Sequence, residues 1–351
     1  MRFQCILYSL ILPVSKSYIL PAYVRRETKL FGITEWRDIM FQVPETYEDQ
    51  NGQRITQNPE EPLRSICILP FPCEELLLLG QTKQLRLYED RFIELFDDAM
   101  ENHEGVVAMG LIAASGIIKT VPLCEVEAYN RMEGFGIFVT IRAVGKASLL
   151  HVVKQEPYIK AVCHELTDIL PQDLKKANLI ADTIEESMLT LSALEHKLDT
   201  LTDNVDTEVD EEMERRIKIA KLDDTFFADD FDEEDDDVEE DRLFDRRRRY
   251  YQAYRVALEV DTQGYVVPSH EVDADMFRSP KELSAVSWAA FMTEILPEED
   301  AIYRIQALDE SNVLKRLALA SYLLRQKRGK LQSKLDSYDA KRKESDDENM
   351  S

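Results

Sequence analysis

The spacing of the apolar residues changes once along the chain, near Pro171, and this change limits which elements each part can form. Between residues 63 and 166 the apolar residues form short or alternating runs, which predict strands. These runs include 76–79, 134–144 and 147–155. The stretch 88–100 instead carries its apolar residues on one helical face. About seven strands, one helix and no repeated βαβ order predict a closed, mostly antiparallel, barrel-like sheet.

Beyond Pro171 the apolar residues step by three and four, which predicts helices. Helices with such stripes bury them against one another, so this part is predicted to form a small bundle. The predicted fold class is therefore α+β. The predicted organisation is a linker over 41–62, a barrel over 63–170, a bundle over 171–200 and 281–343, and a charged tail over 344–351.

An acidic segment divides the predicted bundle. Residues 229–241 (DDFDEEDDDVEED) hold eleven acids in thirteen positions, and charges of one sign at that density repel and resist burial. We therefore predict that the range 201–280 is largely disordered. The run Arg246–Arg249 follows at once, with Tyr250, Tyr251 and Tyr254 behind it. Mutual screening of acids and bases in a solvated loop is the favoured interpretation, and a contact site for an acidic partner or RNA is the alternative.

The range 1–40 has six basic and three acidic residues in an otherwise acidic chain. Its apolar run 3–14 and the small residues at 15–17 resemble a secretory signal. The basic stretch 18–29 then resembles the second part of a plastid presequence, so one expectation is a plastid protein whose N-terminal segment directs targeting. The alternative is an ordinary first strand in a cytoplasmic protein. No apolar run reaches the roughly 18 residues of a membrane-spanning helix, and no span is predicted.

Residues that carry catalysis or bind metals are not arranged for either task. The five cysteines, at 5, 67, 73, 124 and 163, lack CxxC spacing, which favours buried thiols over disulfides or zinc ligands. Phosphate-binding glycine loops and HExxH are missing from the sequence, and the histidines never pair at ligand spacing. Cys163 and His164 would point to opposite faces of a strand. We therefore predict no catalytic, cofactor-binding or metal-binding residues, and no cofactor.

Several motifs, taken in order, resemble the N-terminal domain of Lon proteases over about residues 63–170. They are Leu69-Pro70-Phe71-Pro72, Gly80, Leu85-Arg86-Leu87, Tyr88-Glu89-Asp90-Arg91-Phe92, 116–121, 139–146 and 157–162. Leu79 and Asp90 stand where the family has prolines, which puts the end of the strand before Gly80 in doubt. The resemblance implies a PUA-like pseudo-barrel followed by helices. The sequence includes neither the ATPase nor the protease module of Lon, so we expect a stand-alone Lon-domain protein of the kind found in plants and algae.

The resemblance implies structural roles for seven residues: Pro70, Pro72, Gly80, Glu89, Arg91, Pro157 and Tyr158. Prolines keep the backbone extended, glycine permits a turn, and Glu89 favours the start of a helix. Arg91 is expected to hold a neighbouring loop.

The same resemblance implies a non-enzymatic module that binds substrate or partner proteins, with a link to protein quality control. Its expected partners are unfolded or extended protein segments, or a protease or ligase complex. The candidate apolar surface comprises Phe71, Leu77, Leu78, Phe135 and Phe138, each of which has core packing as its alternative role. Two other functions stay open at this point. One is RNA binding by the Arg/Tyr run 246–254, which the net charge of -25 opposes, and the other is a hydrolase that uses Cys163.

Overall fold

The alternating apolar residues form one seven-stranded sheet. Its strands are β3 (Leu63–Pro72), β4 (Thr82–Leu87), β5 (Val106–Ala113), β6 (Gly116–Ile117), β7 (Thr120–Met132), β8 (Gly136–Lys154) and β9 (Ile159–Glu165). The structure is a computed structural model, and it describes residues 32–38, 46–48, 54–56, 63–113, 116–132, 134–202, 241–260, 265–266, 278–292 and 301–349. The α+β fold class predicted from the sequence is confirmed.

The sheet closes into a barrel through one parallel pair. Strands β3, β9, β8, β7 and β5 are hydrogen-bonded in that order, and β3 also pairs with β5, with Cys67 opposite Val107. The other pairs of the ring are antiparallel. Closure removes the free edges of these strands, whereas β4 lies beside the first half of β8, outside the ring.

Two details of the sheet differ from the sequence prediction. The runs 134–144 and 147–155 form one strand, β8, because its bulges opposite β7 and β9 let it bend without a break. The run 76–79 is not a strand, and follows the short 3₁₀ helix η1 (Cys73–Glu75). There Arg304 donates to the C=O of Leu76 (2.7 Å) and the N–H of Leu78 donates to Oε1 of Gln81 (2.9 Å). Side chains thus bond backbone groups that a strand would have bonded.

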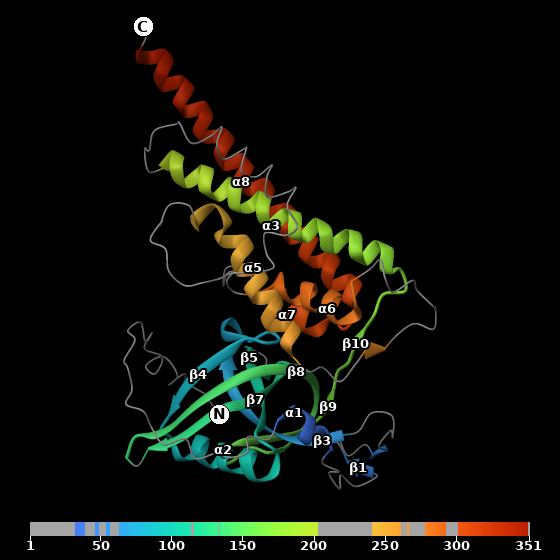
Figure 1. The fold of residues 1–351 in the computed structure, drawn as a ribbon. Coiled ribbons are helices and arrows are strands. Elements are labelled where there is room, and N and C mark those ends of the chain that lie inside the picture. The colour runs from blue at the N-terminus through green and yellow to red at the C-terminus, as the bar shows by residue number, and fades with distance from the viewer. Residues whose placement is uncertain are drawn as a thin grey trace.

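Helix α2 (Asp90–Asn102) packs on the barrel with Leu95, Phe96 and Ala99 buried, as the sequence predicts. The other helices are α1 (Ile33–Asp38), α3 (Leu174–Thr202), α5 (Asp241–Glu259), α6 (Pro280–Ala289), α7 (Ala301–Asp309) and α8 (Val313–Asn349). Figure 1 shows α3, α5, α6, α7 and α8 stacked on one end of the barrel and α2 at the other. The predicted bundle therefore forms. The predicted charged tail, 344–351, is helical as far as Asn349, where α8 ends.

Part of the range 201–280 is folded, contrary to the prediction of disorder. Helix α5 lies beside α3 and α6, with Tyr250 fully buried and Ala253 and Ala257 also in the core. Helix α5 folds because the apolar face that begins at Tyr250 packs in the core. The prediction of disorder followed the charge of the acid-rich stretch that precedes this face. A parallel pair of two-residue strands, β10 (Asp168–Ile169) and β11 (Tyr265–Val266), also includes part of this range. Residues 203–240 lie outside the described residues.

The N-terminal prediction also needs correction within residues 32–38. Trp36 of α1 is fully buried, and Arg37 forms a two-pronged ion pair with Glu165 of β9 (2.6 to 3.2 Å). This part of the range 1–40 therefore belongs to the folded domain. Residues 1–31 lie outside the described residues, and the plastid location stays a prediction. In the predicted linker, β1 (Thr46–Glu48) and β2 (Arg54–Thr56) form an antiparallel pair.

Among the described helices, none combines the length and the apolar character needed to cross a membrane.

A buried carboxylate, Asp168, joins the barrel to the bundle. It accepts hydrogen bonds from Nη1 of Arg316 on α8 (3.0 Å) and from Oγ of Ser284 on α6 (2.8 Å). The ammonium of Lys146 on β8 lies 3.3 Å from Asp168 Oδ1 and donates to the C=O of Leu308 at the end of α7 (3.2 Å). One charged cluster therefore attaches three helices to the barrel.

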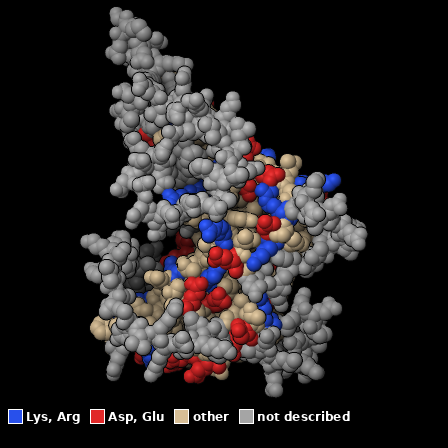
Figure 2. Space-filling view, viewed as in Figure 1, with Lys and Arg blue, Asp and Glu red and all other residues tan. Residues whose placement is uncertain are grey.

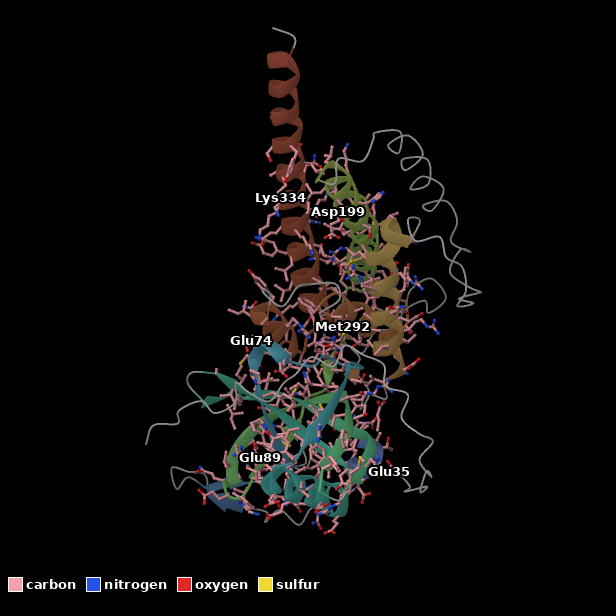
Figure 3. The ribbon with its side chains drawn as sticks, turned by 90° about the vertical axis from the view of Figure 1, so that its left-hand side faces the viewer. Glu35, Glu74, Glu89, Asp199, Met292 and Lys334 are labelled. Atoms are coloured by element: carbon pink, nitrogen blue, oxygen red, sulfur yellow. The ribbon has the colours of Figure 1, made fainter. Side chains whose placement is uncertain are left out.

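The aromatic ring of Trp288 covers this cluster. The guanidinium carbon of Arg316 lies 3.8 Å from the ring centroid, and the Lys146 ammonium lies 5.3 Å from it. Trp288 and Met292 are buried in a hydrophobic core that continues from the barrel into the bundle. Figure 3 shows Met292 at the level where the helices meet the barrel, with Asp199 and Lys334 farther up the bundle. The two parts are therefore packed as one body.

We predict that Asp168→Asn lowers the free energy of unfolding by about 3–5 kcal/mol, because Lys146 and Arg316 would remain buried without their carboxylate. Glu101→Gln, on the exposed side of α2, is the matched control and should change it by less than about 0.5 kcal/mol. Urea unfolding at neutral pH measures both values. Equal stabilities of the two variants would contradict the role of the cluster.

The stability should also depend on pH through Asp168. Burial alone would raise the pKa of this carboxyl group, but Arg316 and Lys146 lower it to about 2. Its contribution is complete above the unfolded-state pKa of about 4 and is lost as the pH falls from there toward 2. The difference in unfolding free energy between wild type and Asp168→Asn should therefore narrow by about 2 kcal/mol across this window. A difference that stays constant in urea titrations from pH 5 to pH 2 would refute the assignment.

Candidate partner-binding surface

The three neighbouring strands β4, β8 and β7 expose one side of the sheet to solvent. Alternation along β4 directs Thr82, Gln84 and Arg86 outward, and the register places Arg86 opposite Phe138. On β7, Ala128 and Asn130 are exposed opposite Thr140 and Phe138. We call these residues the outer sheet face: Thr82, Gln84, Arg86, Ala128, Asn130, Phe138 and Thr140.

Three aromatic side chains lie exposed at one end of this face. Tyr88 is 50% exposed, Phe135 57% and Phe138 36%. Tyr88 follows β4, and Phe135 is in the turn between β7 and β8. Gly136 brings the two segments together: its φ is +88°, and a Cβ there would lie 2.1 Å from the C=O oxygen of Leu87. We call Tyr88, Phe135 and Phe138 the aromatic tip.

Arg142 continues the side of β8 formed by Phe138 and Thr140, and it pairs with Glu127 of β7 (3.6 Å) and with Glu259 of α5 (3.7 Å). The seven residues of the outer sheet face themselves include no Asp or Glu, in a chain of net charge -25. The cation among them is Arg86, whose guanidinium carbon lies 5.4 Å from the centroid of the Phe138 ring. On the face of the molecule shown in Figure 2, acidic and basic side chains are interspersed over the described residues. Exposed aromatic rings beside an arginine are typical of surfaces that bind other macromolecules.

The structure separates the five predicted surface residues into two groups. Phe71 (7% exposed), Leu77 (8%) and Leu78 (0%) are core residues, so their assignment to an exposed surface is wrong. Phe71 lies opposite Leu111 of β5, and the two leucines lie in the segment where Arg304 of α7 bonds the C=O of Leu76. Phe135 and Phe138 are exposed, as predicted. Tyr88 was not among the residues predicted for the apolar surface. Its position just after an alternating strand is a signal that could have indicated its exposure.

Gly80 has the role in the backbone that the resemblance implies for it. Its φ is +88°, and a Cβ there would lie 2.5 Å from the C=O oxygen of Val256 on α5. Pro70 and Pro72 lie at the end of β3, opposite Gly110 and Ile112 of β5.

Glu89 is the N-cap of α2, and Arg91 pairs with it (Nε to Oε2, 2.7 Å). Arg91 also lies over the ring of Phe92, 4.6 Å from its centroid. These two contacts of Arg91 are with its own helix and the N-cap, whereas the resemblance implies a contact with a neighbouring loop.

Tyr158, which follows Pro157, belongs to a cluster around Asp98 of α2. Oδ2 of Asp98 accepts hydrogen bonds from the Tyr158 hydroxyl (2.8 Å), the Lys160 ammonium (2.9 Å) and the Cys67 thiol (3.2 Å). Burial alone would raise the pKa of Asp98, but hydrogen bonds from Lys160 and Asn102 keep it below its usual range. The carboxylate thereby holds α2 against β3 and β9.

This cluster has the donor atoms of a metal site. One ligand atom each from Cys67, Asp98 and His103 lies within 4.8 Å of the others. The Lys160 ammonium, however, already supplies a positive charge at the shared oxygen of Asp98. Burial and Lys160 lower the pKa of His103 to about 4, so the imidazole is neutral at pH 7. The hydrogen bonds that Asp98 accepts from Cys67, Tyr158 and Lys160 account for this cluster.

Three of the described thiols, those of Cys67, Cys124 and Cys163, are poorly suited to act as nucleophiles. Burial, followed by the hydrogen bond to Asp98, raises the pKa of Cys67, and burial raises the pKa of Cys124 and of Cys163 to about 12. A thiol with a raised pKa stays protonated at neutral pH and attacks poorly. Cys163 is fully buried while His164 is partly exposed, which is consistent with opposite faces of β9.

The arginines and tyrosines that suggested RNA binding are largely part of the bundle. Arg246 is buried, and its Nε donates to Glu195 of α3 (2.7 Å). Tyr250 is fully buried, and Tyr251 and Tyr254 pack against the core. A cavity of about 530 Å³ lies beside Arg246 and Arg249, but Glu195 and Asp199 also line it. Acids and bases therefore alternate there, and phosphate groups would meet both signs of charge.

We predict that Asp98→Ala lowers the free energy of unfolding by about 2–3 kcal/mol, because Lys160 and Tyr158 would lose their shared acceptor. Asp97→Ala, one position earlier on α2, removes an exposed carboxylate that bonds Tyr129 and Arg131, and should cost about 1 kcal/mol or less. Chemical denaturation of both variants gives the comparison. The cluster would have no special role if the two losses were the same.

No protein-family model and no curated protein matches the sequence. Among solved structures, the chain is similar to one described as the N terminal domain of Mycobacterium avium complex Lon protease. The identity is 10% and the TM-score 0.42, over 75% of this chain and 98% of that chain. It is also similar to a Lon N-terminal domain protein from Xanthomonas campestris, with 17% identity and a TM-score of 0.28 over 35% of this chain and 72% of that chain. Both structures are described as Lon N-terminal domains, the family whose motifs the sequence resembles.

Proposed function

We propose that the protein is a non-enzymatic module that binds other proteins through the aromatic tip and the outer sheet face. The observation that carries this proposal is the exposure of Tyr88, Phe135 and Phe138, with Arg86 beside the ring of Phe138, at one end of the outer sheet face. Covering exposed aromatic rings with a partner protein removes apolar surface from water and lowers the free energy. Aromatic residues and arginine are also enriched in protein–protein interfaces. The resemblance to Lon N-terminal domains favours unfolded or extended protein segments as partners, in the context of protein quality control.

The described polar clusters support a binding role over a catalytic one. The carboxylates of Asp98 and Asp168 are each engaged by lysine and by further donors, and both clusters hold elements together. RNA binding has weaker support, because Arg246 and Tyr250 of the Arg/Tyr run are buried.

The test replaces the aromatic tip with Tyr88→Ser, Phe135→Ser and Phe138→Ser in one chain. Binding of a permanently unfolded probe, reduced and alkylated lactalbumin, should weaken by at least about tenfold, which corresponds to about 1.4 kcal/mol, while the melting temperature stays unchanged. Fluorescence anisotropy with the labelled probe measures the affinity.

The matched control is a triple variant of equally exposed residues on the helices: Leu179→Ser, Ile302→Ser and Tyr322→Ser. It should bind the probe like the wild type. The proposal fails if the two triple variants bind equally well, or if a labelled oligouridine binds the wild type and the unfolded probe does not.

A further inference from the structure

Strand β4 has one hydrogen-bonded neighbour in the part of the chain that the structure describes. It pairs antiparallel with β8, from Thr82 opposite Arg142 to Leu87 opposite Ile137. β4 therefore presents an edge of six residues. In the described sheet the end of β7 beyond Val126 is a second edge, because β5 pairs with Leu123, Cys124 and Glu125 of that strand. An edge of this kind exposes unpaired N–H and C=O groups, which another chain can pair with.

The hydrogen bonds before β4 indicate which residues face this edge. The N–H of Ala143 donates to the C=O of Gln81 (3.0 Å), so Gln81 bonds toward β8. Bonding alternates along an antiparallel pair, which assigns Lys83, Leu85 and Leu87 to β8 as well. The backbone groups of Thr82, Gln84 and Arg86 then point toward the edge. These three residues also have exposed side chains.

The edge carries Lys83 and Arg86 but lacks several other features that prevent pairing. Its six residues, TKQLRL, include no proline, glycine or acid, and β4 pairs with β8 without a register shift. Lys83 is the residue most able to oppose a neighbouring strand, but its ammonium is in an ion pair with Glu75 (2.8 Å). Figure 3 shows where the edge runs: Glu74, before β4, lies near the helices, and Glu89, after it, lies farther down the barrel.

We propose that the β4 edge binds an extended segment of a partner protein as an added strand. The segment carries a carboxylate that pairs with Arg86 and an apolar side chain that covers Phe138 and Tyr88. This inference rests on the proposed function and adds the geometry and chemistry of the bound segment. Backbone hydrogen bonds to Thr82, Gln84 and Arg86 supply affinity for any extended chain, and the side chains on the outer sheet face select among them.

Charge selects this partner over two others. A second copy of the chain, paired through its own β4, would offer Arg86 no carboxylate, because the strand contains no acid. A single-stranded nucleic acid has no amide groups to continue the ladder, and one arginine is a small share of the charge that such binding uses. A carboxylate on an extended polypeptide complements both the edge and Arg86.

The first test uses a labelled acidic strand-forming peptide, TVDFTVDT, as the probe for the full chain. Gln84→Pro removes the N–H that points toward the edge, a position at which an edge strand tolerates proline. Fluorescence anisotropy should show affinity at least about tenfold lower for Gln84→Pro than for the matched control Gln84→Ala, which keeps the N–H. The same peptide with N-methyl groups at every second residue should bind the wild type at least about tenfold more weakly, and this comparison requires no variant to fold.

The second test is Arg86→Glu, which should reverse the preference of the edge from the acidic peptide to its lysine counterpart, TVKFTVKT. The proposal is overturned if the acidic peptide fails to bind the wild type, if the N-methylated peptide binds equally well, or if Arg86→Glu leaves the preference unchanged. Binding of the unfolded probe separates the two levels of inference. If Gln84→Pro binds lactalbumin like wild type and the aromatic-tip variant does not, the added strand is wrong and the proposed function stands. If both variants bind it like wild type, the proposed function is wrong too.

Discussion

The buried carboxylate of Asp168 is the interaction on which the arrangement of the two parts depends. It lies between Lys146 of the barrel and Arg316 of the bundle, and Ser284 and Trp288 complete its surroundings. Such a cluster is costly to leave incomplete, so the helices that supply its members have one favourable position on the barrel. That position covers one end of the barrel with helices and leaves the outer sheet face and the aromatic tip in solvent.

Periodicity predicted the elements because each buries one face, and this holds for α2 and for the strands of the ring. It failed where side chains far away in sequence bond the backbone. Leucines 76–79 read as a strand, but Arg304, more than two hundred residues later, bonds the C=O of Leu76. It also failed at α5, because composition of the neighbouring acidic segment outweighed the apolar face that contains Tyr250. The contact of Arg304 is not encoded locally, whereas the apolar face of α5 is.

The candidate site was only partly predictable for the same reason. Phe135 and Phe138 are exposed as expected, but nothing in the local pattern distinguishes them from the buried Phe71, which lies opposite Leu111 of β5. Tyr88 and Arg86 are part of the site because β4 pairs with β8, and because the backbone at Gly136 lies close to that at Leu87. The sequence alone does not show this pairing.

The central claim is that this protein binds other proteins at the side of the barrel formed by β4, β8 and β7. Hydrogen exchange of the full chain, followed by mass spectrometry with and without reduced and alkylated lactalbumin, tests it most directly. The account predicts that backbone amides of residues 82–88 and 134–138 exchange more slowly when the unfolded protein is present. Slower exchange confined to α3 and α8, with these two segments unchanged, would contradict it.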